Sequence, residues 1–103
     1  MAIPPLSEEQ LKQARSAATA ARRRRAEVKA RLRAGTMTLP QALELAEDDD
    51  VIAHTKVFDI LRSVPRVGER RARETMERHE IAENRRLRGL GRHQIAGLKA
   101  EFS

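Results

Sequence analysis

Apolar residues in the first third of the chain recur every three or four positions, the spacing of one face of an α-helix. This stripe comprises Leu11, Ala14, Ala18, Ala21, Val28 and Leu32, and Arg25 interrupts it. Ser7 and Gln10 have the spacing of a capping box, and Gly35 is a typical residue to end a helix. The pattern predicts one helix over residues 8–34. Because alanine buries little area, its first half should project, while Val28 and Leu32 dock its second half.

Four shorter helices are predicted after Gly35, over residues 39–47, 51–63, 69–79 and 92–102. Thr38 should cap the first of these, and the acids Asp48 to Asp50 should favour the start of the next through the helix dipole. The residues expected in the core are Leu39, Ala42, Leu43, Ala46, Val51, Ile52, Val57, Phe58, Ile60, Leu61, Ala72, Thr75, Met76, Ile95, Leu98 and Phe102. No segment alternates β-branched residues, so we expect an all-α fold. Residues 1–35 would form an extended leader (1–6) and the long helix, and residues 36–103 a small helical domain.

The charge of the chain is strongly basic and unevenly placed. The 103 residues carry a formal charge of +6, and 17 of the 21 cationic residues are arginine. Residues 1–35 have a net charge of +6, residues 36–63 of −4 and residues 64–103 of +4. The planar guanidinium can bind an oxyanion through two parallel hydrogen bonds. Two basic blocks around an acidic middle therefore suggest two contact surfaces on one polyanion.

The segment from Val64 to Arg73 is the first candidate site. Pro65 stiffens a turn, and Gly68 tolerates a positive φ or a close approach by another backbone. The N–H groups at the following helix start would be unpaired, which suits a phosphate. An ordinary helix–helix turn is the alternative. The candidate phosphate-binding residues are Pro65, Arg66, Val67, Gly68, Arg70 and Arg71.

The second candidate is the arginine-dense segment Asn84 to Gly91. Leu87 and Leu90 are expected to anchor the turn in the core, which leaves its arginines facing outward. Three guanidinium groups within four residues repel one another unless an anion lies between them. A solvated turn is the alternative. The candidate contacts are Arg85, Arg86, Arg88, Gly89 and Gly91.

The long helix offers a weaker, secondary basic surface. Consecutive residues Arg22 to Arg25 point in different directions around a helix, so they form no single stripe. The candidates for a secondary DNA contact are Arg15, Arg22, Arg25, Lys29 and Arg33. A solvated helix explains each of them equally well.

Signals for catalysis, metals or membranes are poor. The chain has no cysteine, and His54, His79 and His93 have no partners at metal-ligand spacing, so they are interpreted as isolated surface imidazoles. No phosphate-loop or nucleophile-elbow motif occurs, and no apolar run suits a signal peptide or a membrane span. Phe58 and Phe102 are the two aromatic residues and fit core positions, so duplex binding is favoured over base stacking on a single strand. We expect a cytoplasmic, non-enzymatic protein without a metal or cofactor.

The two arginine-rich segments, Val64-Pro-Arg-Val-Gly-Glu-Arg-Arg-Ala and Arg85-Arg-Leu-Arg-Gly-Leu-Gly, resemble those of the actinobacterial integration host factors. The leader Met-Ala-Ile-Pro-Pro-Leu, the Asp50-Val-Ile segment and the ending from Leu98 to Phe102 are also similar, so the resemblance covers nearly the whole chain. It implies a helix-two-turn-helix domain and duplex-DNA binding with little sequence preference. It also implies DNA bending, nucleoid organisation and assistance to a phage integrase in site-specific recombination.

By this resemblance, Pro65 and the backbone at Val67 and Gly68 correspond to a phosphate-facing turn, and Arg85, Arg86 and Arg88 to DNA-contacting arginines. Glu69 departs from the family, which often has lysine after Val-Gly; Arg70 or Arg71 could substitute. We expect a monomeric DNA-binding protein. The alternatives are an RNA-binding ribosomal-type protein with the same turn-helix motif, a protein-interaction module using the acidic patch from Glu44 to Asp50, and a Schiff-base repair lyase. For the lyase, Pro4 is not terminal and Lys56 lies in a predicted core helix.

Overall fold

A computed structural model describes residues 5–103 of the chain. The elements are α1 (Glu8–Ala34), α2 (Leu39–Asp48), α3 (Asp50–Ala53), α4 (Val57–Ser63), α5 (Glu69–Arg78), the 3-10 helix η1 (Leu87–Gly89) and α6 (Arg92–Glu101). One isolated antiparallel bridge joins Lys56 to Arg86. The predicted all-α class is therefore confirmed. Residues 1–4 of the predicted leader lie outside the described residues, and Pro5 and Leu6 are exposed and not helical.

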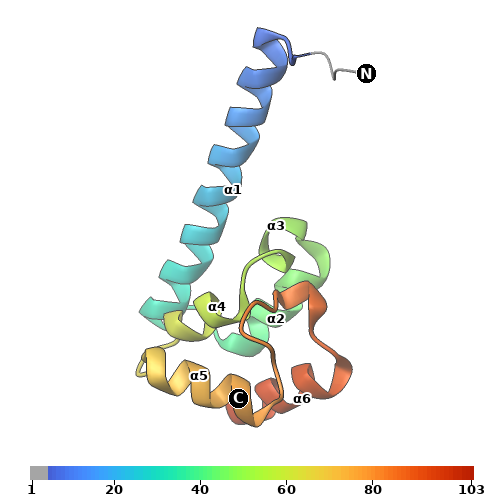
Figure 1. Ribbon diagram of the computed structural model, residues 1–103. Helices are drawn as coiled ribbons and strands as arrows, with labels where there is room; N and C mark the ends of the chain where they lie inside the picture. The colour runs from blue at the N-terminus through green and yellow to red at the C-terminus, as the bar shows by residue number, and fades with distance from the viewer. Residues whose placement is uncertain (1–4) are drawn as a thin grey trace.

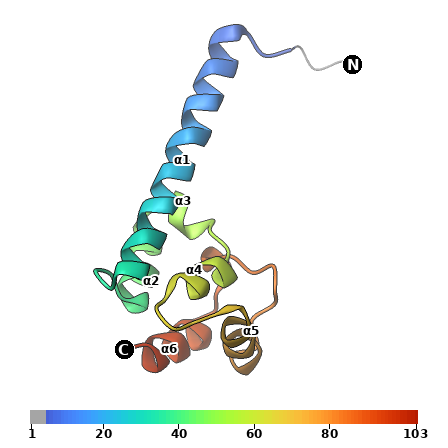
Figure 2. The ribbon, with the colours of Figure 1, turned by 90° about the vertical axis from the view of Figure 1, so that its left-hand side faces the viewer.

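Helix α1 extends far beyond the helical domain, as Figures 1 and 2 show from two directions. The Ser7 hydroxyl accepts from the Gln10 N–H at 3.1 Å, and the Gln10 side chain accepts from the Ser7 N–H at 2.9 Å, which completes the predicted capping box. Gly35 ends the helix with φ 77°. Leu11 and the first alanines of the stripe are exposed, whereas Val28 and Leu32 are fully buried. The predicted projection of the first half is thus what the structure shows.

The core lies where the last turns of α1 meet the other helices. Helix α1 packs against α3 and α4, α2 against α3, α6 and η1, and α4 against α5. The buried apolar side chains of this core are Val28, Leu32, Met37, Leu39, Ala42, Leu43, Ile52, Val57, Ile60, Leu61, Val67, Ala72, Met76, Ile81, Leu87, Leu90 and Leu98. Ala46, Phe58, Ile95 and Phe102 are half-buried at its margin rather than inside it. Leu87 and Leu90 anchor the arginine-dense turn as predicted.

The helix predicted over residues 51–63 is wrong, because the chain breaks into α3 and α4. Residues 54–56 pair with a distant segment instead: Leu87 N–H donates to the Thr55 carbonyl at 3.0 Å, and Val57 N–H to the Arg85 carbonyl at 3.0 Å. Lys56 is consequently an exposed, extended residue before α4 and not part of a core helix. This pairing fixes the arginine-dense turn against the α3–α4 junction.

Helix α5 ends in a turn that leads the chain back towards α6. Ile81 N–H donates to the Met76 carbonyl at 2.8 Å and Glu80 N–H to the Glu77 carbonyl at 3.1 Å, with Glu80 in the left-handed region at φ 55°. This is the Schellman arrangement, and buried Ile81 supplies its apolar contact. Gln94 of α6 donates to the Glu80 carbonyl at 2.9 Å.

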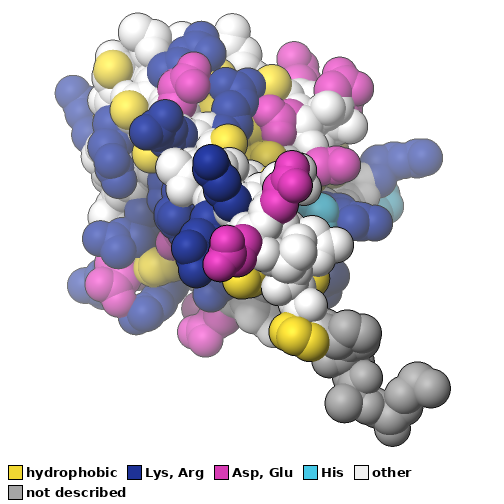
Figure 3. Space-filling model, turned by 90° about the horizontal axis from the view of Figure 1, so that it is seen from above, with side chains coloured by type: hydrophobic (Ala, Val, Ile, Leu, Met, Phe, Trp, Pro, Cys, Tyr) yellow, Lys and Arg dark blue, Asp and Glu magenta, His cyan; other side chains and the backbone are white. Residues whose placement is uncertain are grey.

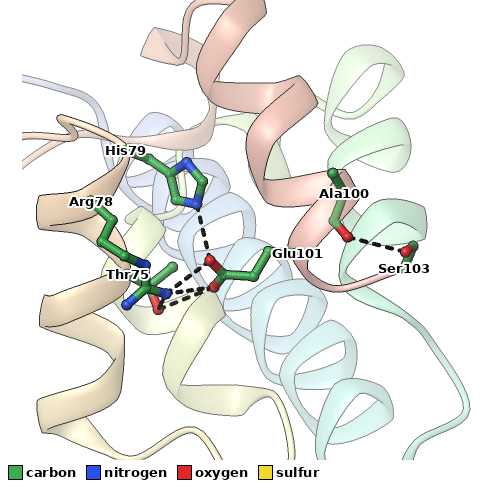
Figure 4. Close-up of polar contacts among 6 residues, drawn as sticks. All are labelled: Thr75, Arg78, His79, Ala100, Glu101 and Ser103. Carbon is green, nitrogen blue, oxygen red and sulfur yellow. Dashed lines mark hydrogen bonds and ion pairs between the residues drawn. The ribbon is translucent and has the colours of Figure 1, made fainter.

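A polar cluster joins the far ends of α5 and α6 (Figure 4). Arg78 donates to both carboxylate oxygens of Glu101 at 2.8 and 2.9 Å, and the His79 ring lies 3.3 Å from the same carboxylate. Burial would raise the pKa of Glu101, but the hydrogen bonds from Arg78 and His79 outweigh it and hold the pKa below its ordinary value. The interpretation of His79 as an isolated surface imidazole is therefore wrong.

No helix among residues 5–103 is both long and apolar enough to cross a membrane.

Candidate nucleic-acid interface

The first candidate site is a tight turn between α4 and α5. Val67 N–H donates to the Val64 carbonyl at 3.1 Å, which closes a turn with Pro65 at its second position. The third position, Arg66, has φ 69°, where glycine or asparagine is usual. Positive φ was expected to be tolerated at Gly68, yet Gly68 has φ −84°. The strained residue of this turn is thus an exposed arginine.

Gly68 is the N-cap of α5, and no side chain of residues 5–103 caps this helix start. The first four N–H groups of a helix have no acceptor within it, so those of residues 68–71 are available to an anion. A Cβ placed at Gly68 would meet no protein atom within 4 Å. The missing side chain therefore leaves open space in front of the helix end, where the dipole favours negative charge.

Some charged side chains around this helix start form ion pairs within α5, and others have no acidic partner in the described residues. Glu69 pairs with Arg73 at 2.8 Å and Arg70 with Glu74 at 3.1 Å, and the Arg70 side chain is 93% exposed. Exposed pairs of this kind are weak and easily exchanged for another anion. Among residues 5–103, no acid forms an ion pair with Arg66 or Arg71. Arg71 lies over the half-buried Phe102 ring at 5.9 Å from its centre.

The second candidate site is the turn that carries Arg85, Arg86 and Arg88. All three side chains are exposed, and within the described part of the chain none pairs with an acid. Arg85 donates to the Gly89 carbonyl at 3.2 Å, and Arg86 donates to the His54 carbonyl. A surface hollow of about 500 Å³ opens between them, lined by His54, Asn84, Arg85, Arg86, Arg88 and Gly89. Such a basic hollow has the charge and the donors to hold a phosphate group.

Glycines in this turn have different roles. A Cβ at Gly89 would lie 2.7 Å from Cδ of Arg85, so this glycine makes room for the arginine rather than for a ligand. Gly91 is the N-cap of α6, where its N–H donates to the Gln94 side chain at 2.8 Å. The start of α6 therefore lies directly after the arginine turn, and within the described residues Gln94 is the one side chain that accepts from its N–H groups.

His54 lies in the arginine hollow, and the sequence did not identify it as a site residue. Its Nδ1 lies 2.6 Å from the Asp50 carbonyl, and its Nε2 lies 3.4 Å from Nη1 of Arg88. The interpretation of His54 as an isolated imidazole is therefore wrong. The separation of 34 positions between His54 and Arg88 explains why no local motif indicated this contact.

The two turns remain separate surfaces in the fold. No hydrogen bond joins residues 64–71 to residues 84–91 in the described structure. In Figure 1 the first turn leads into α5, whereas the second lies nearer α2 and α6.

The secondary candidates are spread along α1, from Arg15 on its projecting half to Lys29 and Arg33, which neighbour the buried Val28 and Leu32 in the sequence. Arg15, Arg22 and Arg33 are exposed, and Arg25 and Lys29 are half-buried. Arg24 instead pairs with Asp49 at 3.0 Å and thereby ties α1 to α3. Seen from above in Figure 3, Lys and Arg side chains gather on the left of the molecule, and acids are more frequent at the upper right.

Among residues 5–103, no group of three His, Cys, Asp or Glu side chains could hold a metal ion.

Residues 32–102 match the model of the S13-like H2TH domain. The integration host factor of Streptomyces coelicolor is 49% identical over 102 residues, which cover 99% of this chain and 95% of that protein. The integration host factor of Mycobacterium tuberculosis is 47% identical, covering 99% and 97%. A solved structure of sIHF bound to an 8bp palindromic DNA is 48% identical, with a TM-score of 0.83, and the match covers 85% of this chain and 99% of that one. The chain belongs to the integration host factor family, and its helical domain is an S13-like H2TH domain.

Proposed function

We propose that this protein binds duplex DNA through the phosphate backbone and acts without enzymatic chemistry. The observation that carries the proposal is the arginine hollow: Arg85, Arg86 and Arg88 surround it, and no acid among residues 5–103 neutralises them. The solved relative bound to DNA supports the same conclusion. The uncapped start of α5, with Arg66 and Arg71 beside it, would contact a second stretch of backbone.

The proposed binding has little sequence preference. Guanidinium groups and helix N–H groups recognise phosphates, which carry no sequence information directly. No exposed aromatic ring or amide cluster marks a base-reading element in the described structure. Preference among sites would then follow how easily a given sequence deforms.

A second contact along α1 would let a monomer bend one duplex or bridge two. The whole of α1 is about 40 Å long at 1.5 Å per residue, and its first half projects beyond the domain, so basic side chains on that half would reach DNA that the domain does not. We assign Arg15, Arg22, Arg25, Lys29 and Arg33 to this surface. In this proposal residues 1–35 and 36–103 serve as two DNA-contacting parts.

Nucleoid organisation and assistance to a phage integrase are the cellular roles that fit such a protein. Both need a protein that shapes DNA at many sites rather than one that reads a single operator. Membership of the integration host factor family supports this assignment.

Fluorescence anisotropy with a short labelled duplex at rising salt tests the proposal. Counterion release predicts that the logarithm of the affinity falls linearly with the logarithm of salt concentration, with a slope of about −0.9 per phosphate neutralised. A flat response would refute phosphate-backbone binding. A structured RNA competitor distinguishes the ribosomal-type alternative: tighter binding of RNA than of DNA would favour it.

Replacing Arg85, Arg86 and Arg88 together by lysine preserves the charge but removes the bidentate fork. We expect DNA affinity to fall about tenfold, because each lost fork weakens a charge-assisted contact. Matched replacement of Arg70 and Arg73 by lysine, where the arginines pair with acids of α5, should have a smaller effect. Equal losses in the two variants would mean that the arginine hollow is not the principal contact.

A further inference from the structure

The His54 side chain is fixed by its own helix turn. It follows α3 directly, and its Nδ1 lies 2.6 Å from the Asp50 carbonyl oxygen. A carbonyl oxygen can only accept, so Nδ1 must carry the hydrogen. In the neutral ring, Nε2 is then the acceptor and points away from the helix.

That acceptor lies beside Arg88. Nη1 of Arg88 is 3.4 Å from Nε2, and an arginine can only donate. The tautomer that the Asp50 carbonyl requires, with the hydrogen on Nδ1, is therefore the one that lets Nε2 accept from Arg88. The other two arginines of the turn have backbone acceptors: Arg85 donates to Gly89, and Arg86 to the main chain of His54. Arg88 alone of the three is held by a side chain.

Arg88 lies at the border between two hollows of opposite character. One is the basic hollow with His54, Arg85 and Arg86. The other, of about 450 Å³, is lined by apolar residues together with Glu47 and Asp50. A guanidinium without a partner at this border would be attracted to those two acids and away from the basic hollow.

We propose that His54 is a positioning residue of the DNA-binding surface, whose ring Nε2 holds Arg88 in the basic hollow and away from Glu47 and Asp50. This inference rests on the proposed DNA binding and names one further residue of the same site. Arg24 does not compete for this role, because it pairs with Asp49 at 3.0 Å.

Three variants test the role of the ring. His54→Ala removes the acceptor but keeps the main-chain oxygen that binds Arg86, and we expect the Kd for a short labelled duplex to rise about fivefold, the effect of one typical hydrogen bond. His54→Gln places an acceptor at the position of Nε2 and should restore most of the affinity. Arg88→Ala combined with His54→Ala should be no weaker than Arg88→Ala alone, because the ring acts through that arginine.

Arg66 supplies the matched control. It is exposed, lies on the other turn and has no hydrogen bond to His54, so the losses from Arg66→Ala and His54→Ala should add. If the losses from Arg88→Ala and His54→Ala also add, the positioning role is overturned. An unchanged Kd in His54→Ala would overturn it too. Thermal unfolding of each variant checks that replacing these exposed residues leaves the fold intact.

A measurement without DNA separates this inference from the proposed function. The side-chain N–H signals of Arg88 in a nitrogen-15 spectrum should shift in His54→Ala and return towards their original positions in His54→Gln. If wild type fails to bind duplex DNA, the proposed function fails while these signals still decide whether His54 holds Arg88. Unshifted Arg88 signals in His54→Ala would contradict the inference whatever the DNA result.

Discussion

At the scale of single residues, Arg66 and Gly68 of the candidate interface both stabilise the fold less than other residue types would. Arg66 occupies the left-handed region at φ 69°, although a glycine there would be unstrained. Gly68 has no side chain to cap α5, although serine or aspartate would stabilise a helix start. Both choices keep charge and open space in front of the α5 helix end. In the proposed function, the stability lost here would serve phosphate binding.

Replacing Arg66 with glycine should raise the free energy of unfolding and weaken DNA binding. Relief of the left-handed strain contributes about 1 kcal/mol, partly offset by the greater freedom of glycine in the unfolded chain. Urea unfolding and anisotropy measure the two effects. The matched variant Arg66→Ala loses the same guanidinium but keeps the strain, so it should bind equally weakly without any gain in stability. A gain in stability with alanine would show that the strain is not the cause.

Replacing Gly68 with serine should also separate stability from binding. A serine hydroxyl at the N-cap accepts from a backbone N–H of the first helical turn and stabilises the helix by a few tenths of a kcal/mol, roughly the difference between serine and glycine caps. The same hydroxyl occupies an N–H that a phosphate would need, and it fills the open space at Gly68. We expect a higher melting temperature and a several-fold weaker affinity for DNA. Unchanged affinity would exclude this helix start as a phosphate site.

At the scale of elements, one acidic residue connects α1, α2 and α3. Asp49 lies between α2 and α3, accepts from the N–H groups of Val51 and Ile52 at 3.0 and 3.2 Å, and accepts from Arg24 at 3.0 Å. The hydrogen bond from Arg24 is the main cause that lowers the pKa of Asp49, and it outweighs the burial of the carboxyl, which would raise it. The long helix is therefore fastened to the domain by a group that must stay ionised.

This arrangement predicts a loss of stability in acid. Because the folded-state pKa of Asp49 is lower than the ordinary value of 3.8, its contribution is present above that value and disappears as the pH falls through the folded pKa. Asp49→Asn keeps a good N-cap but loses the charge, so wild type should be the more stable protein at pH 7, and the difference should shrink in acid. Asp49→Ala should cost about 1 kcal/mol more, since it removes the cap as well. Chemical unfolding at several pH values measures this, and a difference independent of pH would argue against the ionised pair.

At the scale of the whole molecule, the projecting helix decides the shape. The principal-axis extents are 48 × 32 × 25 Å, and the long axis follows α1 beyond the domain (Figure 2). The exposed half of α1 carries a stripe of alanine flanked by cations. Self-association through that stripe would bring like charges together, so a polyanion is the better partner for this surface.

Replacing Arg15, Arg22, Lys29 and Arg33 together by glutamine should impair the shaping of long DNA more than binding to a short duplex. In the proposed function the short duplex would be held mainly by the two turns of the domain, whereas bending or bridging would need the distant contact. Atomic force microscopy of long DNA and anisotropy on a short duplex give the two readouts. Equal losses in both would place α1 within a single binding surface instead.

Local signals in the sequence predicted α1 and the exposed arginine turn well. The helix is bounded by Ser7 and Gly35, whose capping acts within a few residues, and Leu87 and Leu90 anchored the turn as their apolar character indicated. The break at residues 54–56 was missed because hydrogen bonds to Arg85 and Leu87 cause it, and their distance along the chain leaves no local pattern. The left-handed Arg66 was missed because its residue type disfavours the conformation.

The sequence by itself determined the helical class, the caps, the apolar faces and the excess of arginine in two turns, since these depend on spacing and charge along a few turns of chain. Only the tertiary structure decided which cations pair with acids that are distant along the chain and which remain available. It placed Arg24 against Asp49 and Arg78 against Glu101, and left Arg88 beside His54. Electrostatic pairing depends on distance through space, and the fold sets that distance between residues far apart in the chain.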